Sequence, residues 1–371
     1  MRVLITHQGF TEYGGAEKFL ESIATLFPGA DIFCMVANPD AIPESLRGRK
    51  IITSFMDRIP GGKRLYQYLT FLGPLAVESF NAGQYDLVFS SDGTFTKGVL
   101  TADDAVHLCY CHSPHRSLWD RYSEYQQKLP WLVRIIFTLS SHYLRLWDFN
   151  AAQRVDVYLA NSEHIRKRIW KYYRRDSVVV FSPSANIEKG FIGSEFDDYY
   201  LSVSRLDSVK RVDLLIEACK RLQRKLIVVG RGPEEQYLRS IAGESVEFRS
   251  WVSSEELATL YSRCRAVLFA SYEDLGLVPI EAQSYGRPVV AYGKGGALET
   301  VIPGVGGVLF PEQTVESVTN GILEFEKAES SFSPVKIRES VMRFSTGAVM
   351  KHFQAVINDA LVKAGKPPID F

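Results

Sequence analysis

The 371-residue sequence predicts an α/β protein with two Rossmann-like, doubly wound domains that face each other across a cleft. Short apolar runs alternate with amphipathic helical patterns, which is typical of parallel sheets covered by helices on both faces. The alternation stops at 186–198, where glycine and acidic residues replace the apolar period, and then restarts. We therefore expect a linker there between an N-terminal domain, 1–190, and a C-terminal domain, 191–345. A last helical segment, 346–371, can cross back to the first domain.

The first half begins with an apolar strand at 2–6, and a double glycine, Gly14 and Gly15, leads into an amphipathic helix. Further strands of this half are expected at 31–36, 85–89, 106–111 and 155–160. These elements together predict one Rossmann-like domain.

In the second half the same alternation repeats. Strands are expected at 200–203, 226–229, 246–248, 266–270 and 288–291, and helices at 212–222 and 234–241. Ser253 begins a further helix, with Glu256 in capping-box spacing. The last helical pattern ends at Gly365.

The composition limits the classes of partner. Forty-three basic and forty-three acidic residues give no net charge, so no nucleic-acid partner is expected. No segment is long and apolar enough to span a membrane, and no secretory signal opens the chain. The five scattered cysteines suit a reducing compartment, so we expect a cytoplasmic protein.

The most informative stretch runs from Glu273 to Glu281, two carboxylates eight positions apart with Gly276 between them. It lies between the predicted strands at 266–270 and 288–291. A unit of strand, glycine loop, helix and strand presents free backbone N–H groups and the positive end of a helix above the sheet. Such a unit favours an anionic phosphate.

Two cations follow the first strand of the second half. Arg205 comes soon after the strand at 200–203, and Lys210 lies five residues further on. Two cations at the carboxyl end of a strand can hold a diphosphate through charge-assisted hydrogen bonds. Surface cations near helix starts are also common, and the glycine loop at Gly230 can equally be a simple turn.

Four segments together resemble the retaining glycosyltransferases of family 4, which have the GT-B fold. The segments are Gly14-Gly15-Ala16-Glu17, Ser204-Arg205-Leu206 with Lys210, Val229-Gly230-Arg231-Gly232-Pro233, and 273–281. The resemblance spans nearly the whole chain. Within the family, 292–300 and 111–114 look most like bacterial mannosyltransferases that build surface polysaccharides such as lipopolysaccharide O-antigen.

This resemblance implies roles for the charged residues. Arg205 and Lys210 would bind the donor diphosphate and neutralise the charge that grows on it as the sugar leaves. Glu273 would face the donor sugar, and Glu281 would accept hydrogen bonds from the ribose hydroxyls. The two glutamates are therefore expected to hold hydroxyl groups.

Backbone groups complete the implied donor site. The N–H groups of Gly276, Leu277 and Val278 would bind phosphate or sugar oxygens at the helix start. Gly14 and Gly15 would let the backbone approach the diphosphate with no side chain between them.

Four further residues are implied near the base and the sugar. Trp251 and Val252 would lie beside the base, and Gly230 would belong to the nucleotide-sugar site. His112 follows the strand at 106–111 and matches the family histidine near the reacting sugar, where a neutral imidazole can position the reaction. It can also be a loop histidine satisfied by a backbone group.

The implied reaction is transfer of a hexose with retention of the anomeric configuration. The expected donor is GDP-mannose, and the acceptor is a glycan or a polyprenyl-linked glycan. A donor phosphate oxygen would take the acceptor proton, and no cofactor and no metal are expected. Two departures from the family pattern are the stretch 180–186, before the linker, and Leu275, where phenylalanine is common.

Cysteine and histidine side chains, the usual zinc ligands, occur close together at Cys109, Cys111, His112 and His115. We expect Cys109 and Cys111 to point to opposite faces of their strand, which argues against a zinc site. No metal ligands are therefore predicted.

Aromatic and basic side chains interleave between Trp119 and Trp147. Such a mixture can rest on a membrane surface, which would place the protein on the inner face of the cell membrane. The alternative is a long helical insertion whose aromatic side chains are buried.

Three other functions fit parts of the sequence. A glycoside hydrolase would use Glu273 and Glu281 as its two carboxylates, but it leaves Arg205, Lys210 and Gly15 unexplained. A nucleotide-sugar epimerase would have the same overall fold. A catalytically silent subunit would bind nucleotide or a partner transferase without turnover.

Overall fold

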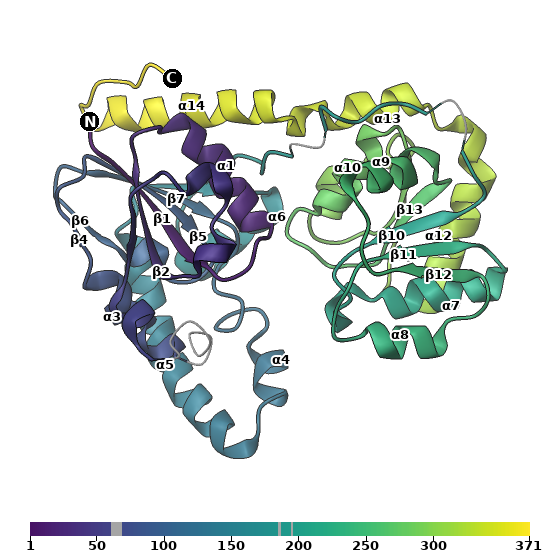
Figure 1. Cartoon of the computed structure of the whole chain (residues 1–371), viewed down its shortest axis with the longest axis horizontal. Coiled ribbons are helices and arrows are strands. Elements are labelled where there is room, and N and C mark those ends of the chain that lie inside the picture. Colours follow the sequence, from purple (N-terminus) through teal and green to yellow (C-terminus); the bar gives the residue numbers. More distant parts are fainter. Residues whose placement is uncertain (61–68, 185–186, 194–195) are drawn as a thin grey trace. The chain divides into compact units, whose positions relative to one another are not determined.

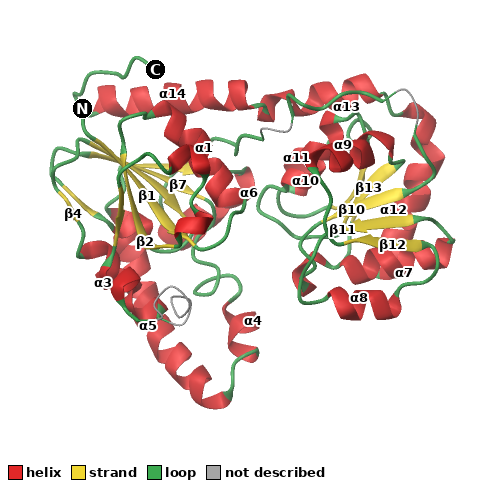
Figure 2. Ribbon diagram, in the orientation of Figure 1, coloured by secondary structure: helices red, strands yellow, loops and turns green. Residues whose placement is uncertain are grey.

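The computed structural model describes residues 1–60, 69–184, 187–193 and 196–371. The chain divides into two compact units, which are described separately. The first unit contains Met1–Ser182 and Met350–Phe371, and the second contains Pro183–Val349. Each unit has its own parallel sheet with flanking helices (Figures 1 and 2). The prediction of two doubly wound α/β units is confirmed.

The first unit is built on a seven-stranded parallel sheet with the order β3-β2-β1-β5-β7-β8-β9. The strands are β1 Val3–Phe10, β2 Asp31–Ala37, β3 Ile51–Thr53, β5 Leu87–Asp92, β7 Val106–Cys111, β8 Val157–Ala160 and β9 Ser177–Val179. A two-stranded sheet pairs β4 Asn81–Ala82 with β6 Leu100–Thr101. Every residue of β5 and of β7 is buried, including the polar Ser90, Ser91 and Asp92 at the end of β5.

The helices described in the first unit follow the strands. They are α1 Gly15–Leu26, α3 Gly73–Glu78, α4 Tyr122–Gln127, α5 Trp131–Gln153, α6 Glu163–Tyr173 and α14 Thr346–Lys363, which begins in the second unit. Short 3-10 helices are Pro39–Ala41, Glu44–Leu46, Phe55–Arg58, Thr70–Leu72 and Thr96–Gly98. The sequence predicted α1 well because its apolar side chains recur at helical spacing.

The second unit is built on a six-stranded parallel sheet with the order β12-β11-β10-β13-β14-β15. The strands are β10 Tyr200–Val203, β11 Leu226–Val229, β12 Val246–Arg249, β13 Ala266–Phe269, β14 Val289–Tyr292 and β15 Gly307–Phe310. The helices are α7 Val212–Leu222, α8 Glu235–Ile241, α9 Ser254–Arg263, α10 Leu277–Ser284, α11 Ala297–Thr300, α12 Val315–Ala328 and α13 Pro334–Val341. The 3-10 helices are Ser208–Lys210, Glu329–Ser331 and Met342–Phe344.

Helix α9 begins where its cap predicts. The Ser253 hydroxyl accepts a hydrogen bond from the backbone N–H of Glu256 at 3.1 Å. The Glu256 carboxylate pairs with Arg249 at 2.7 Å. The cap therefore uses the serine, while the glutamate ties α9 to the end of β12.

The division between the units falls after Ser182, not at residue 190. Residues after this point pack into the second unit because Ile187 is buried and Gly190 lies against Ser284, where a Cβ atom would come within 2.5 Å of the Ser284 carbonyl. Residues 185, 186, 194 and 195, which include parts of the predicted linker, lie outside the described residues.

Helix α14 carries the end of the chain into the first unit from Met350 onward. The Phe353 ring packs near the rings of Phe19, Phe89 and Tyr110, with centroid distances of 5.8, 6.2 and 5.5 Å. Since these partners come from α1, β5 and β7, the C-terminal helix completes the core of the first unit.

Candidate functional site

The sheet of the second unit has a topological switch point between β10 and β13. These strands are neighbours, and the chain proceeds from β10 toward β12 and from β13 toward β15, in opposite directions across the sheet. In open parallel sheets, ligands bind outside the carboxyl ends of the strands at such a point. Arg205 and Lys210 follow β10, and Glu273 follows β13. The predicted charged residues therefore lie at this switch point.

Lys210 and Glu273 are brought into direct contact. Lys210 Nζ lies 2.5 Å from Glu273 Oε1, and the two side chains are 24% and 28% exposed. The Ser271 hydroxyl also donates to the Lys210 carbonyl at 3.4 Å. The sequence predicted both residues for one site, but their ion pair became evident only from the structure.

Arg205 lies in the same loop and is more accessible. Its side chain is 64% exposed, and its Nε lies 3.2 Å from Asp207 Oδ2. An exposed guanidinium can turn to an incoming anion, because an exposed ion pair contributes little free energy.

The start of α10 offers backbone donors beside this pair. Gly276 is the N-cap residue with φ of 82°, a left-handed conformation that glycine adopts without steric cost. Glycine provides no side-chain acceptor, and the first N–H groups of a helix have no acceptor within the helix. The N–H groups of Leu277 and Val278 are therefore suited to an oxyanion.

Two adjacent glycines, Gly295 and Gly296, support the loop that carries Glu273. A Cβ atom on Gly295 would lie 2.4 Å from the Glu273 carbonyl, and one on Gly296 would lie 2.3 Å from the Leu275 Cα. The Gly296 N–H donates to the Glu273 carbonyl at 2.8 Å. Sequence reasoning noted this stretch only as a family likeness, although two adjacent glycines in the loop after β14 are a sign of close backbone approach.

Gly230 has a packing role in the structure. Its φ is 145°, and a Cβ atom there would lie 1.8 Å from the Ser204 carbonyl. A Cβ atom on Gly232 would lie 2.3 Å from the Leu206 carbonyl. The two glycines therefore let the loop after β11 approach the loop after β10, which carries Arg205.

Glu281 lines a pocket of about 290 Å³ in the second unit. Its Oε2 accepts a hydrogen bond from the Tyr261 hydroxyl at 3.1 Å. Burial, together with the charge of Glu281, raises the pKa of Tyr261 well above its usual value, so this hydroxyl remains a donor. The pocket is lined by Lys189, Ser254, Glu255, Leu257, Ala258, Tyr261, Glu281 and Tyr285.

The pocket combines the two surfaces that a nucleoside needs. Leu257 and Ala258 from α9 are apolar, whereas Glu281, Ser254 and Glu255 provide polar groups. Trp251 and Val252 precede α9; Trp251 is 73% exposed, and Val252 packs partly against the core.

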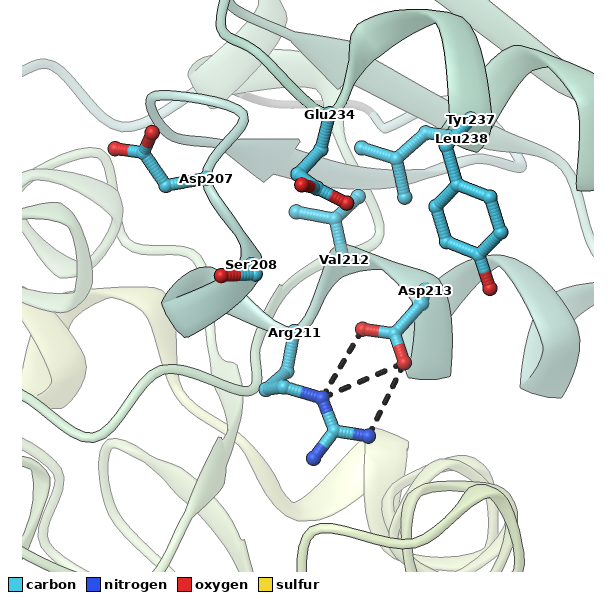
Figure 3. A pocket seen from close by; sticks show the side chains of 8 residues that line it. All are labelled: Asp207, Ser208, Arg211, Val212, Asp213, Glu234, Tyr237 and Leu238. Atoms are coloured by element: carbon cyan, nitrogen blue, oxygen red, sulfur yellow. Dashed lines mark hydrogen bonds and ion pairs between the residues drawn. The ribbon is translucent and has the colours of Figure 1, made fainter. Parts of the chain in front are cut away.

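A smaller pocket of about 140 Å³ lies beside the loop after β10 (Figure 3). Three acidic residues, Asp207, Asp213 and Glu234, line it, and Arg211 is the one basic lining residue. Arg211 turns to Asp213, with its Nη2 3.1 Å from Asp213 Oδ2. The negative charge of this pocket disfavours a phosphate there, which leaves Lys210 and the start of α10 as the better anion site.

In the first unit, His112 follows β7, as predicted. Its Nε2 lies 2.9 Å from the Ser91 hydroxyl, and its backbone N–H donates to the Asp92 carbonyl at 2.8 Å. The edges of the Phe19 and Tyr110 rings contact the half-buried imidazole. The side chain is thus held at the carboxyl edge of the first sheet with a fixed orientation.

Gly14 and Gly15 begin α1 at the same edge. The Gly14 N–H donates to Glu17 Oε2 at 2.8 Å, while Glu17 Oε1 lies 3.3 Å from His7 Nε2. A Cβ atom on Gly15 would meet no atom within 4 Å, so its surface faces open space. Sequence reasoning missed the contact of His7 with Glu17, because a histidine within a strand shows no sign of its partner.

The cysteine prediction is wrong in one respect. Cys109 and Cys111 pack in the same core cluster, because residues two apart on a strand share a face. Burial raises the pKa of both thiols well above the usual value, and it lowers the pKa of His115 to about 4. Within the described ranges, no group of three histidine, cysteine, aspartate or glutamate side chains could hold a metal ion.

The segment from Trp119 to Trp147 is neither wholly buried nor wholly accessible. Trp147 is 9% exposed, and the Trp119 ring stacks on Tyr172, whereas Trp131 is 69% exposed. The alternative of a long helical insertion with buried aromatic side chains is therefore wrong for the first half of α5. No helix in the part of the chain that the structure describes is long and apolar enough to cross a bilayer.

Comparison with known proteins finds one family that is similar to the second unit. Residues 185–340 match the family described as "Glycosyl transferases group 1". The match lies within the second unit and covers less than half of the chain. The matched residues include Arg205, Lys210, Glu273 and Glu281.

Curated relatives are distant. The chain is 26% identical over 255 residues to Alpha-1,3/1,6-mannosyltransferase ALG2 of Saccharomyces cerevisiae, covering 55% of this chain and 49% of the yeast protein. It is 24% identical over 292 residues to human ALG2, covering 64% and 67%. It is also 32% identical over 168 residues to glycogen synthase of Thermus thermophilus, covering 43% and 38%. The match thus spans about half of the yeast relative.

Solved structures show the fold. A lipopolysaccharide outer core galactosyltransferase, WaaB, has a TM-score of 0.67 at 18% identity and covers 98% of this chain and 99% of its own. Sucrose-phosphate synthase from Thermosynechococcus elongatus has a TM-score of 0.73 at 17% identity, covering 98% and 100%. HepE of Anabaena, solved with UDP-glucose, has a TM-score of 0.67 at 18% identity, covering 97% and 100%. The chain therefore has the GT-B fold.

Proposed function

We propose that the protein is a retaining hexosyltransferase that takes its sugar from a nucleoside diphosphate sugar. The observation that carries this proposal is the contact of Lys210 with Glu273 at the switch point, beside the glycine that opens α10. A cation, a carboxylate and free helix N–H groups at one place match the three needs of such a donor. The cation binds the diphosphate, the carboxylate accepts hydrogen bonds from the sugar hydroxyls, and the N–H groups donate to the phosphate oxygens.

Binding of the donor breaks the ion pair between Lys210 and Glu273. When the diphosphate binds, Lys210 Nζ turns to its oxygens, and the Glu273 carboxylate becomes available to the sugar hydroxyls. Arg205, which pairs with Asp207, joins Lys210 in neutralising the charge that grows on the leaving diphosphate. Two protein cations supply this stabilisation, so the proposed reaction needs no metal and no cofactor.

The nucleoside occupies the pocket lined by Glu281. The carboxylate accepts hydrogen bonds from the ribose hydroxyls while Tyr261 fixes its orientation. Leu257 and Ala258 provide the apolar wall for the base, with Val252 beside them. The roles of Trp251 and Gly230 are proposed accordingly: Trp251 lies exposed beside the base, and Gly230 shapes the cation loop.

In the first unit, His112 hydrogen-bonds the donor sugar as a neutral imidazole. Its contact with Ser91 and the ring edges around it hold one orientation. Gly14 and Gly15 bring the start of α1 to the diphosphate. Retention follows from a same-face reaction in which a donor phosphate oxygen takes the acceptor proton.

We propose mannose from GDP-mannose as the sugar and donor. The mannosyltransferase relatives from yeast and human support this choice, as does the sequence likeness to bacterial enzymes of surface polysaccharide synthesis. The acceptor is a glycan or polyprenyl-linked glycan, at the inner face of the cell membrane. HepE was solved with UDP-glucose, so uridine donors are the alternative that an experiment must separate.

The first test measures binding and turnover. Nucleoside diphosphates and their sugars are screened by thermal stabilisation of the protein, and the best binder is then tested for sugar transfer. GDP and GDP-mannose are expected to stabilise most. Binding without any release of nucleoside diphosphate would indicate a silent nucleotide-binding subunit, and acceptor-independent interconversion of the free nucleotide sugar would indicate an epimerase.

The second test locates the donor. Lys210→Ala and Glu281→Ala are each expected to weaken nucleotide binding in calorimetry by roughly tenfold to a hundredfold, because each removes a charge-assisted hydrogen bond. Lys363→Ala is the matched control, since Lys363 pairs with Asp359 on the exposed surface of α14. Unchanged affinity in both site variants would refute the assignment of the pocket.

A further inference from the structure

The first half of α5 exposes a continuous set of large apolar side chains. This apolar tip, residues 131–139, includes Trp131, Leu132, Val133, Ile135, Ile136 and Leu139, which are 69%, 57%, 44%, 52%, 66% and 70% exposed. Apolar surface of this extent on a folded protein marks an interaction site. The tip needs a partner that covers it.

The tip is held outward by the helix before it. Tyr122 of α4 stacks on Phe137, with ring centroids 5.5 Å apart, and the Gln126 amide donates to the Thr138 hydroxyl at 2.9 Å. The Arg145 guanidinium lies 4.3 Å from the centre of the Tyr122 ring. Helices α4 and α5 thus support each other while the tip stays exposed.

The second half of α5 is anchored in the core through Asp148. Its carboxylate receives hydrogen bonds from the Trp119 indole at 2.7 Å and the Tyr173 hydroxyl at 2.9 Å, and Asp148 Oδ1 lies 2.6 Å from Lys97 Nζ. Lys97 and Asp148 are both fully buried. A helix fixed so firmly at its base cannot turn its exposed half toward the core.

The tip lies on the functional edge of the first sheet. The chain leaves β7 at Cys111, passes His112, and returns through α5 to the beginning of β8 at Val157. Helix α5 has 23 residues and is about 35 Å long, whereas β7 has six residues and is about 20 Å long. The first half of α5 therefore extends beyond the carboxyl edge, as Figure 1 shows.

The charge around the tip is positive. From 121 to 147 the chain has four basic residues, Arg121, Lys128, Arg134 and Arg145, and one acidic residue, Glu124. Lys128 and Arg134 are exposed beside the apolar side chains. Basic side chains that border exposed aliphatic and tryptophan side chains match the interface of an anionic bilayer.

The exposure extends around the whole helix. Residues 131–136 are all exposed, and six consecutive helical residues point in every direction around the axis. A second copy of the chain would cover one side of such a helix, whereas lipid can surround it. A bilayer is thus the partner that covers all of these side chains.

We propose that the apolar tip inserts into the interface of an anionic lipid bilayer. Trp131, Leu132 and Ile136 enter the acyl boundary, while Lys128 and Arg134 contact the lipid phosphates. The inference deepens the proposed function, on which it rests, because it places the edge that carries His112 at the surface from which a lipid-linked acceptor is presented.

Sedimentation of the full chain with vesicles tests the proposal. The protein is expected to bind vesicles of phosphatidylcholine with phosphatidylglycerol, with a blue shift of tryptophan emission as Trp131 leaves water. The double variant Leu132→Gln with Ile136→Gln should lower the partition coefficient by at least about tenfold. Lys128→Gln with Arg134→Gln should lower it mainly on the anionic vesicles, by about fivefold for each charge.

The matched control is Val335→Gln with Val362→Gln, because these side chains are 54% and 59% exposed on other helices. Equal loss of binding in this control would overturn the proposal, as would wild-type protein that stays in solution with both vesicle types. A lipid-free dimer that the tip variant dissociates, seen by light scattering, would assign the surface to a second copy. Calorimetry with nucleotide is run in parallel, and its failure with vesicle binding intact would refute the donor site alone.

Discussion

His112 shows what a single side chain contributes and what its sequence position leaves open. The end of a buried strand predicted a histidine at the carboxyl edge, and the structure places it there with Ser91 as a hydrogen-bond partner. Its catalytic role stays a prediction. The same reasoning could not find the contact of His7 with Glu17, which depends on two segments that meet only in the folded chain.

We expect His112→Ala to lower turnover by roughly a hundredfold to ten-thousandfold, because it removes a hydrogen bond to the reacting sugar. The affinity for nucleoside diphosphate should change little, since His112 is proposed to contact the sugar, whereas Lys210 and Glu281 are proposed to bind the diphosphate and the nucleoside. Steady-state rates and calorimetry measure the two effects. Ser91→Ala, which removes one hydrogen-bond partner of His112, should have a smaller effect, and a wild-type rate in His112→Ala would return the residue to a structural role.

The loops after the strands of the second sheet act as one packed element. Gly230 and Gly232 fit against the loop after β10, and Gly295 and Gly296 fit against the loop after β13. Sequence reasoning interpreted Gly230 as part of the nucleotide site and left the later pair unused. A close contact between two backbone segments leaves no periodic pattern in a sequence. Only the structure could therefore show that these glycines position the charged loops.

Gly296→Ala tests this support directly. The new Cβ atom would lie 2.3 Å from the Leu275 Cα, so the loop with Glu273 must move, at a cost of about 1–3 kcal/mol. Because Gly296 has an ordinary φ of −65°, the effect comes from contact and not from backbone strain. Nucleotide affinity should fall with stability, whereas Gly347→Ala, at the start of α14 where no atom lies within 4 Å, should lower neither.

For the molecule as a whole, buried ionisable groups link stability to pH. Burial lowers the pKa of His107 and His115 from 6.5 to about 4. Both side chains are neutral in the folded state at neutral pH, and the unfolded chain binds protons more readily below pH 6.5. The contribution of these two neutral histidines to the free energy of unfolding is therefore fully present above pH 6.5, and it is lost as the pH falls toward 4.

Each histidine should lower the free energy of unfolding by up to about 3 kcal/mol over this range. Denaturant unfolding at a series of pH values measures the slope. His107→Gln keeps a polar partner for Ser90 but does not titrate, so its slope should be shallower than that of the wild type. His142→Gln, on the exposed surface of α5, is the control, and identical slopes for all three proteins would contradict the assignment.

The sequence by itself determined the two doubly wound units, most of their strands and the charged residues that follow β10 and β13, but it missed the strands β3, β9 and β15. The units and most of their strands could be predicted because buried strands, helix caps and glycine loops are local patterns. The tertiary structure decided that Lys210 contacts Glu273, that Glu281 lines a pocket with Tyr261, and that the first half of α5 is exposed. These features depend on contacts between distant segments, and periodicity within one segment carries no information about what lies against it.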